Sequence, residues 1–135
     1  MEQVVNTFVI PNIREDFVLR CLETMHRYTP KGFQIIIIDQ TPDGILKDIP
    51  SWMFDGYFRP YRNLGFAKAT NLGIKVAQGK INEVFEYKDF KEGLHKDFRW
   101  MELRNEEKDR IVLYGLLRKD FQFNPPYITE CNDDV

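Results

Sequence analysis

The chain has 135 residues and a mass of 16.1 kDa, enough for one domain with its own hydrophobic core. Its net charge of −2, spread over interspersed acidic and basic residues, argues against nucleic acid or an anionic membrane surface as a partner. There is no signal peptide or apolar run near the ~20 residues that span a bilayer, and Cys21 and Cys131 lie in apolar patterns typical of buried, reduced thiols, which together predict a cytoplasmic protein.

The first forty residues alternate between strand and helix patterns. A run of β-branched residues predicts a buried strand over Val4–Ile10, and Pro11 ends it because proline cannot donate to a β-ladder. Apolar residues at helical spacing predict a helix over Glu15–Tyr28. Successive apolar positions over Phe33–Asp39 are typical of a central parallel strand that is covered on both faces.

The segment Asn63–Gly79 is the centre of the predicted domain. A short helix over residues 45–53, interrupted at Pro50, and a weak strand over Gly56–Tyr61 precede it. Small residues at every fourth position let one helical face lie close against a sheet, namely Gly65, Ala69, Gly73 and Ala77, and the predicted apolar contacts are Phe66, Ile74 and Val76. The free N–H groups of its first turn favour an anion, although close packing alone also explains the small residues.

The second half of the chain differs in composition from the first. Residues 80–126 are densely charged, with a helical pattern over Asn105–Lys119, and a last strand is predicted over Tyr127–Cys131. We therefore expect a single α/β domain over residues 1–135, with a Rossmann-like, mostly parallel sheet of about four strands flanked by helices. Residues 80–126 form an atypical, partly helical insertion before the last strand, as an extra layer, a lid or a docking surface.

Polar residues follow each predicted strand. Because ligands of parallel sheets bind at the carboxyl ends of the strands, these residues are expected to converge on one crevice. They are Asn12, Asp39, Arg62, Asn63, Asp133 and Asp134.

Together these stretches resemble the nucleotide-binding half of a family 2 glycosyltransferase of the GT-A fold. The resemblance rests on Phe8–Pro11, on Ile35–Asp39 followed by Asp43-Gly44, on Arg62–Gly79, and on Tyr127–Val135. The third stretch is the most specific, because Asn-Leu-Gly-Phe-Ala-x-Ala-x-Asn-x-Gly-Ile-x-x-Ala-x-Gly is long and free of gaps. The final Asn-Asp-Asp-Val resembles that family's variant of the Asp-x-Asp metal motif.

The resemblance implies a UDP-, GDP- or TDP-linked sugar as ligand. Asp39 would hold the base or ribose, with Pro11 and Asn12 in the same pocket. Asp134 and Asn132 would bind Mg²⁺ or Mn²⁺, with Asp133 beside them at the nucleotide sugar. Such a cation stabilises the charge on a departing diphosphate. Further positive potential would come from Arg62, Lys68 and the start of the helix at Asn63 and Gly65.

Several features leave the activity open. The base-pocket loop reads Asn12-Ile13-Arg14, which departs from the family pattern, and the chain stops at Val135, before the acceptor half and its general base. Transfer is therefore expected only if the missing half is supplied, whether the sequence is a truncated piece of a longer chain or a homo-oligomer or a partner chain completes the site. The alternatives are a nucleotide-diphosphate binder without transfer activity and a partner-docking remnant. Taken alone, Asp39 is equally well explained as a turn cap. Asp133-Asp134 alone is better explained as a solvated chain end, and Lys68 alone as a surface charge.

Overall fold

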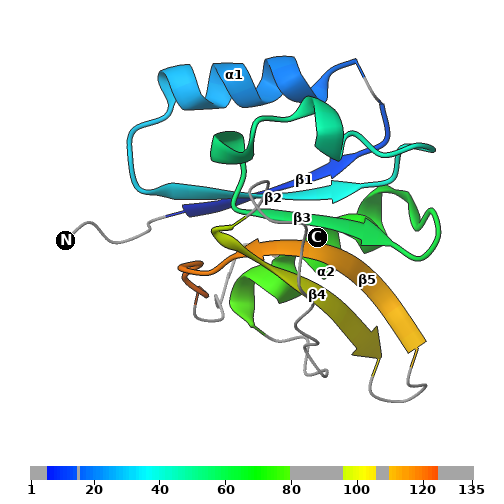
Figure 1. Cartoon of the computed structure of the whole chain (residues 1–135). Coiled ribbons are helices and arrows are strands. Elements are labelled where there is room, and N and C mark those ends of the chain that lie inside the picture. Colours follow the sequence, from blue (N-terminus) through cyan, green and yellow to red (C-terminus); the bar gives the residue numbers. More distant parts are fainter. Residues whose placement is uncertain (1–5, 15, 80–95, 106–109, 125–135) are drawn as a thin grey trace, which may run out of the picture.

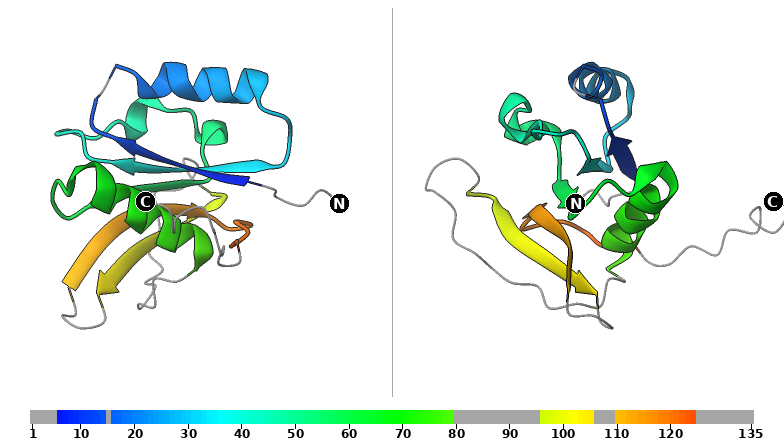
Figure 2. Two further views of the ribbon diagram at one scale, coloured as in Figure 1. Left: turned by 180° about the vertical axis from the view of Figure 1, so that it is seen from behind. Right: turned by 90° about the vertical axis from the view of Figure 1, so that its right-hand side faces the viewer.

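The computed structural model of the chain describes residues 6–14, 16–79, 96–105 and 110–124. Five strands form one sheet in the order β1-β2-β3-β5-β4, and the helices α1 and α2 cover opposite faces of it (Figures 1 and 2). The elements are β1 (Asn6–Asn12), α1 (Val18–Tyr28), β2 (Phe33–Asp39), the 3-10 turns η1 (Leu46–Asp48) and η2 (Ser51–Met53), β3 (Gly56–Pro60), α2 (Gly65–Gln78), β4 (Phe98–Asn105) and β5 (Arg110–Arg118).

The three N-terminal strands run parallel, with β2 in the middle. The predicted central strand is confirmed with the same bounds. Its four isoleucines, Ile35 to Ile38, are fully buried and alternate between the α1 face and the α2 face. Each such burial is worth about 1.5–3 kcal/mol relative to an exposed side chain, so β2 anchors both halves of the core.

Helix α2 packs closely on the sheet through its small residues. Ala69, Gly73 and Ala77 are buried, and a Cβ on Gly73 would lie 2.2 Å from Cγ1 of Val9 in β1. The predicted contacts of two larger residues are wrong, because Phe66 is 74% exposed and Ile74 is 41% exposed. The predicted packing of Gly65 is also wrong, because Gly65 is exposed with open space around it. Ile74 follows the buried Gly73 and is turned about 100° around the helix from it, away from the sheet.

The predicted helix over residues 105–119 is wrong, because β4 and β5 form an antiparallel hairpin there. β5 also pairs antiparallel with β3, so the described sheet has two parallel and two antiparallel strand pairs rather than a mostly parallel arrangement of four strands. In β5, Leu113 and Leu117 face the α2 side while Leu116 faces the α1 side. Apolar residues on both faces of a buried strand imitate helical spacing.

Some predictions concern residues that the structure does not describe, and others can be compared with it directly. The last strand over residues 127–131 and the residues Asn132, Asp133 and Asp134 lie outside the described residues, as does Cys131. The expected burial of Cys21 is wrong, because it lies on the exposed side of α1. Residues 45–53 form η1 and η2 around Pro50. None of the described helices has the length and apolar character of a membrane span.

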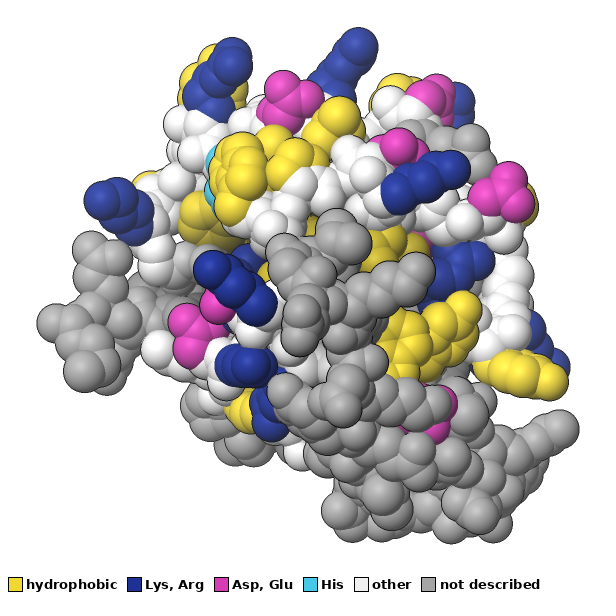
Figure 3. Space-filling model, in the orientation of Figure 1, with side chains coloured by type: hydrophobic (Ala, Val, Ile, Leu, Met, Phe, Trp, Pro, Cys, Tyr) yellow, Lys and Arg dark blue, Asp and Glu magenta, His cyan; other side chains and the backbone are white. Residues whose placement is uncertain are grey.

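The mixed α/β arrangement is consistent with a Rossmann-like half-domain. On the face shown in Figure 3, acidic and basic side chains of the described residues are interspersed and form no continuous basic stripe.

Candidate functional site

The carboxyl ends of β1 and β2 lie side by side at one edge of the sheet. Asn12 and Asp39 are partners in the β1–β2 register, and the backbone N–H of Gln40 donates to the carbonyl oxygen of Asn12 at 2.7 Å. The side-chain oxygen of Gln40 then accepts from the N–H of Leu64 at 2.7 Å, directly before α2. The ends of two strands and the start of a helix are thus joined around one point, and the crevice expected at this edge stays a prediction.

Two buried amide groups at this edge lack acceptors. Asn12 is 7% exposed, and its Nδ2 has no hydrogen-bond partner in the described structure; the same is true of Nε2 of Gln40. Because the oxygen of Gln40 already accepts from Leu64, its NH2 group is fixed as a donor. An unsatisfied buried donor costs about 1–3 kcal/mol, which an acceptor oxygen on a ligand recovers. Gln40 was not predicted as a site residue, although it directly follows the Asp39 that ends the strand.

The Asp39 carboxylate is fully buried and saturated by donors of the chain itself. Its Oδ1 accepts from the N–H and the hydroxyl of Thr41 at 3.0 and 2.7 Å. Its Oδ2 accepts from the N–H of Ile45 at 2.9 Å, from the hydroxyl of Tyr57, and from Nη1 of Arg59 at 3.2 Å. A carboxylate has about four lone-pair sites, so these five donors occupy it completely. Asp39 caps the turn that follows β2, and its direct contact with a ligand stays a prediction.

Tyr57 and Arg59 share the buried charge of Asp39. Burial raises the pKa of Tyr57, and the hydrogen bond and the negative charge of Asp39 raise it further, so the phenol remains a donor. Burial lowers the pKa of Arg59, but its interactions with Tyr57 and Asp39 outweigh that effect and the net shift is upward. The guanidinium also donates to the carbonyl of Thr41 at 2.9 Å. Gly44, at φ +77°, makes room for it, because a Cβ there would lie 2.7 Å from Nη1.

The other predicted contacts surround the start of α2. Arg62, Asn63, Gly65 and Lys68 are all exposed, and Pro11 is half-buried in β1. Oδ1 of Asn63 accepts from the N–H of Gly65 at 3.0 Å, which shapes the turn before the helix. These residues therefore border the same edge of the sheet as Asn12 and Gln40.

The described residues contain no group of three or more His, Cys, Asp or Glu side chains that is arranged to hold a metal ion. Asp39 is unavailable as a ligand because donors of the chain already surround it. The predicted ligands Asp134 and Asn132 lie outside the described part, and so does Asp133. Their role stays a prediction from the sequence.

A family model described as Glycosyl transferase family 2 matches residues 7–85. The match begins in β1, includes Asn12, Asp39 and Gln40, and extends past the end of α2, whereas the β4–β5 hairpin lies beyond it. No curated protein and no solved structure matches the chain. The matched part contains every element that meets at the carboxyl edge of β1 and β2.

Proposed function

The chain belongs to glycosyl transferase family 2, and on that premise we propose that it is the donor-binding half of a glycosyltransferase. The ligand is a nucleotide-diphosphate sugar, linked to UDP, GDP or TDP, bound at the carboxyl edge of β1 and β2. The observation that supports this most directly is the pair of buried, unpartnered amide donors on Asn12 and Gln40. Transfer additionally requires an acceptor-binding site with a general base.

Each predicted residue has a physical role in this proposal. Asn12 and Gln40 donate to acceptor atoms of the nucleotide, beside Pro11 in the base pocket. Asp39 holds the turn after β2, and its predicted contact to the base or ribose would replace one of the donors that occupy its carboxylate. Arg62, Lys68 and the start of α2 at Asn63 and Gly65 place positive potential near the diphosphate.

Members of this family generally depend on a divalent metal. The oxygen donors of Asn132, Asp133 and Asp134 are of the type that Mg²⁺ and Mn²⁺ prefer, and we assign Asp134 and Asn132 as ligands, with Asp133 beside them at the nucleotide sugar. When bound, the cation neutralises charge on the departing diphosphate.

Replacement of Asp134 by alanine is expected to abolish metal-dependent nucleotide binding. Calorimetric titration of UDP, GDP and TDP into the chain with Mn²⁺, and again with EDTA, measures this directly. The original chain is expected to bind one of the three only in the presence of Mn²⁺. Asp120→Ala, at an exposed position after β5, is the matched control and is expected to bind normally.

The absence of binding by a sample whose circular dichroism shows a folded domain would contradict the donor site. A partner-docking remnant would then account better for the fold. Binding without sugar transfer or hydrolysis would instead favour a nucleotide binder without catalytic activity.

Replacement of Asn12 by leucine is expected to separate stability from binding. Leucine has a similar volume and removes a buried donor that has no acceptor, so the free energy of unfolding is expected to stay unchanged or to rise by up to about 1 kcal/mol. Nucleotide binding is expected to weaken by about tenfold, because the ligand loses a hydrogen bond. Urea denaturation and calorimetry give the two quantities.

The matched control is Asn6→Leu, at the exposed amino end of the same strand. It is expected to leave nucleotide binding unchanged. If Asn12→Leu destabilises the chain and leaves the affinity as it was, the amide serves the fold, and the main support for the donor site is lost.

A further inference from the structure

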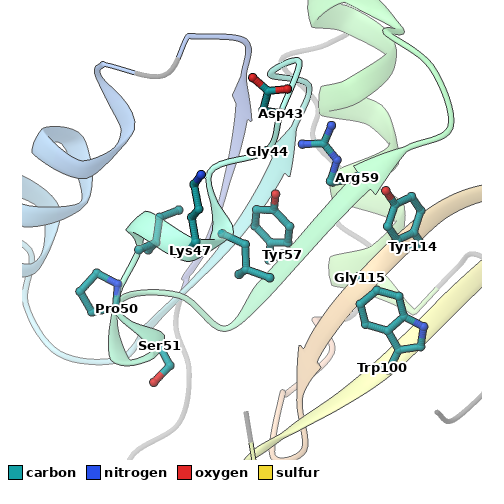
Figure 4. A pocket seen from close by; sticks show the side chains of 12 residues that line it. Asp43, Gly44, Lys47, Pro50, Ser51, Tyr57, Arg59, Trp100, Tyr114 and Gly115 are labelled. Atoms are coloured by element: carbon teal, nitrogen blue, oxygen red, sulfur yellow. The ribbon is translucent and has the colours of Figure 1, made fainter. Parts of the chain in front are cut away.

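A pocket of about 570 Å³ lies on the α1 face of the sheet, between residues 43–51 and the β4–β5 hairpin (Figure 4). Tyr57 and Arg59 of β3 lie between its two walls. Trp100 and Tyr114 of the hairpin form one wall, and the loop with η1 forms the other. The β4–β5 hairpin, which forms the aromatic wall, lies beyond the residues that match the family model.

The hairpin wall is aromatic. The ring centroids of Trp100 and Tyr114 are 5.7 Å apart with planes inclined by 49°, and both residues are half-buried. Two inclined rings that keep part of their surface open offer a flat ligand an apolar contact without a deep cavity. A ligand with at least one flat apolar face therefore fits this wall.

The opposite wall carries both signs of charge. Asp43 and Lys47 are exposed, and neither side chain has a hydrogen-bond or ion-pair partner in the part of the chain that the structure describes. Arg59 is neutralised by Asp39 at 3.2 Å. The charges of Asp43 and Lys47 cancel, so the rim gives no net attraction to an anion or a cation, and it offers one acceptor group and one donor group to a ligand whose hydroxyls both donate and accept.

We propose that this pocket binds a neutral saccharide. A pyranose ring has an apolar C–H face for the rings of Trp100 and Tyr114, and its hydroxyl groups donate to Asp43 and accept from Lys47. Because a hydroxyl group both donates and accepts hydrogen bonds, a saccharide fits Asp43 and Lys47 better than a purely aromatic ligand does. The pocket shares none of the residues proposed to contact the nucleotide, so this inference goes beyond the donor site and is tested separately.

The two tryptophans of the chain allow a direct test. Trp52 is 62% exposed, meets His26 edge to face and does not line the pocket, so Trp52→Phe leaves Trp100 as the sole tryptophan. Its fluorescence is followed during titration with methyl glycosides of neutral hexoses and N-acetylhexosamines, and with their disaccharides. A saturable change in Trp100 emission is expected. Trp100→Phe, in which only Trp52 reports, is expected to show none.

A second pair of variants avoids the aromatic wall. Asp43→Ala in the Trp52→Phe background is expected to weaken the saccharide response by about tenfold, because a charge-assisted hydrogen bond is lost. Asp48→Ala, at an exposed position of η1 that does not line the pocket, is the matched control and is expected to respond normally. Metal-dependent UDP binding is expected to be the same in all these variants.

Three results would overturn the inference. One is the absence of any saccharide response in folded Trp52→Phe protein. Another is an equal response in Trp100→Phe, which would place the binding outside the pocket. The third is a response of Trp100 to uridine or guanosine but to none of the saccharides, which would assign the pocket to a nucleoside.

Discussion

Replacement of Gly115 by alanine is expected to unfold the domain or to lower its free energy of unfolding by at least about 3 kcal/mol. Gly115 lies in β5 opposite Phe58 of β3. A Cβ at this position would lie 1.8 Å from the carbonyl oxygen of Tyr57 and 2.7 Å from Cα of Phe58. Both are backbone atoms, so no rotamer change relieves the overlap and the two strands must separate.

The separation matters because the β3–β5 ladder joins the hairpin to the parallel half of the sheet. Moving β5 would also expose Leu113, Leu116 and Leu117, which are fully buried. Urea denaturation followed by circular dichroism measures the loss. Gly65→Ala is the control, because Gly65 has φ +81° and open space around it, so only a backbone strain of about 1 kcal/mol is expected there. An equal loss in the two variants would contradict the close approach at Gly115.

Replacement of Asp39 by asparagine is expected to lower the free energy of unfolding by about 3–5 kcal/mol. The substitution keeps the shape of the side chain but removes the charge that neutralises Arg59, and it turns an acceptor oxygen into an NH2 group that faces other donors. The side chain of Asp39 is fully buried, so water cannot replace the lost acceptor.

Thermal and urea denaturation of Asp39→Asn measure this loss, with Asp48→Asn as an exposed control in the next turn. A loss below about 1 kcal/mol would show that the network of Asp39 is weaker than its contacts suggest. Nucleotide titration of the same variant, at a temperature where it is folded, then tests whether Asp39 also contacts the ligand. Unchanged affinity would limit Asp39 to shaping the turn.

Local patterns predicted the parts of the fold in which one periodicity dominates. The apolar run of β2 predicted a central strand with the observed bounds, and the spacing of Ala69, Gly73 and Ala77 predicted the face of α2 that meets the sheet. The pattern failed over residues 105–119, because a strand buried on both faces has no polar side to reveal its period of two. The run Ile-Val-Leu-Tyr-Gly-Leu-Leu in β5 carries the β-branched and aromatic residues that favour a strand, and its glycine marks a close backbone approach.

The candidate site, too, could be predicted from the sequence only in part. The polar residues after β1 and β2 were predicted to meet, because parallel strands end at the same edge, and the family followed from motifs that are continuous in the sequence. The saturation of Asp39 was not predictable, because its donors come from Thr41, Ile45, Tyr57 and Arg59 and meet only when β3 lies beside β2.

The sequence by itself therefore determined the family, the central strand, the packing face of α2 and the edge at which a ligand is expected. Only the tertiary structure decided that β5 pairs with β3, that Asn12 and Gln40 keep unpartnered donors, and that an aromatic pocket forms on the α1 face. The physical reason is the separation along the chain over which each kind of interaction acts. Periodicity and turn chemistry act between near neighbours, whereas strand order and the satisfaction of buried polar groups depend on residues that are brought together by the whole sheet.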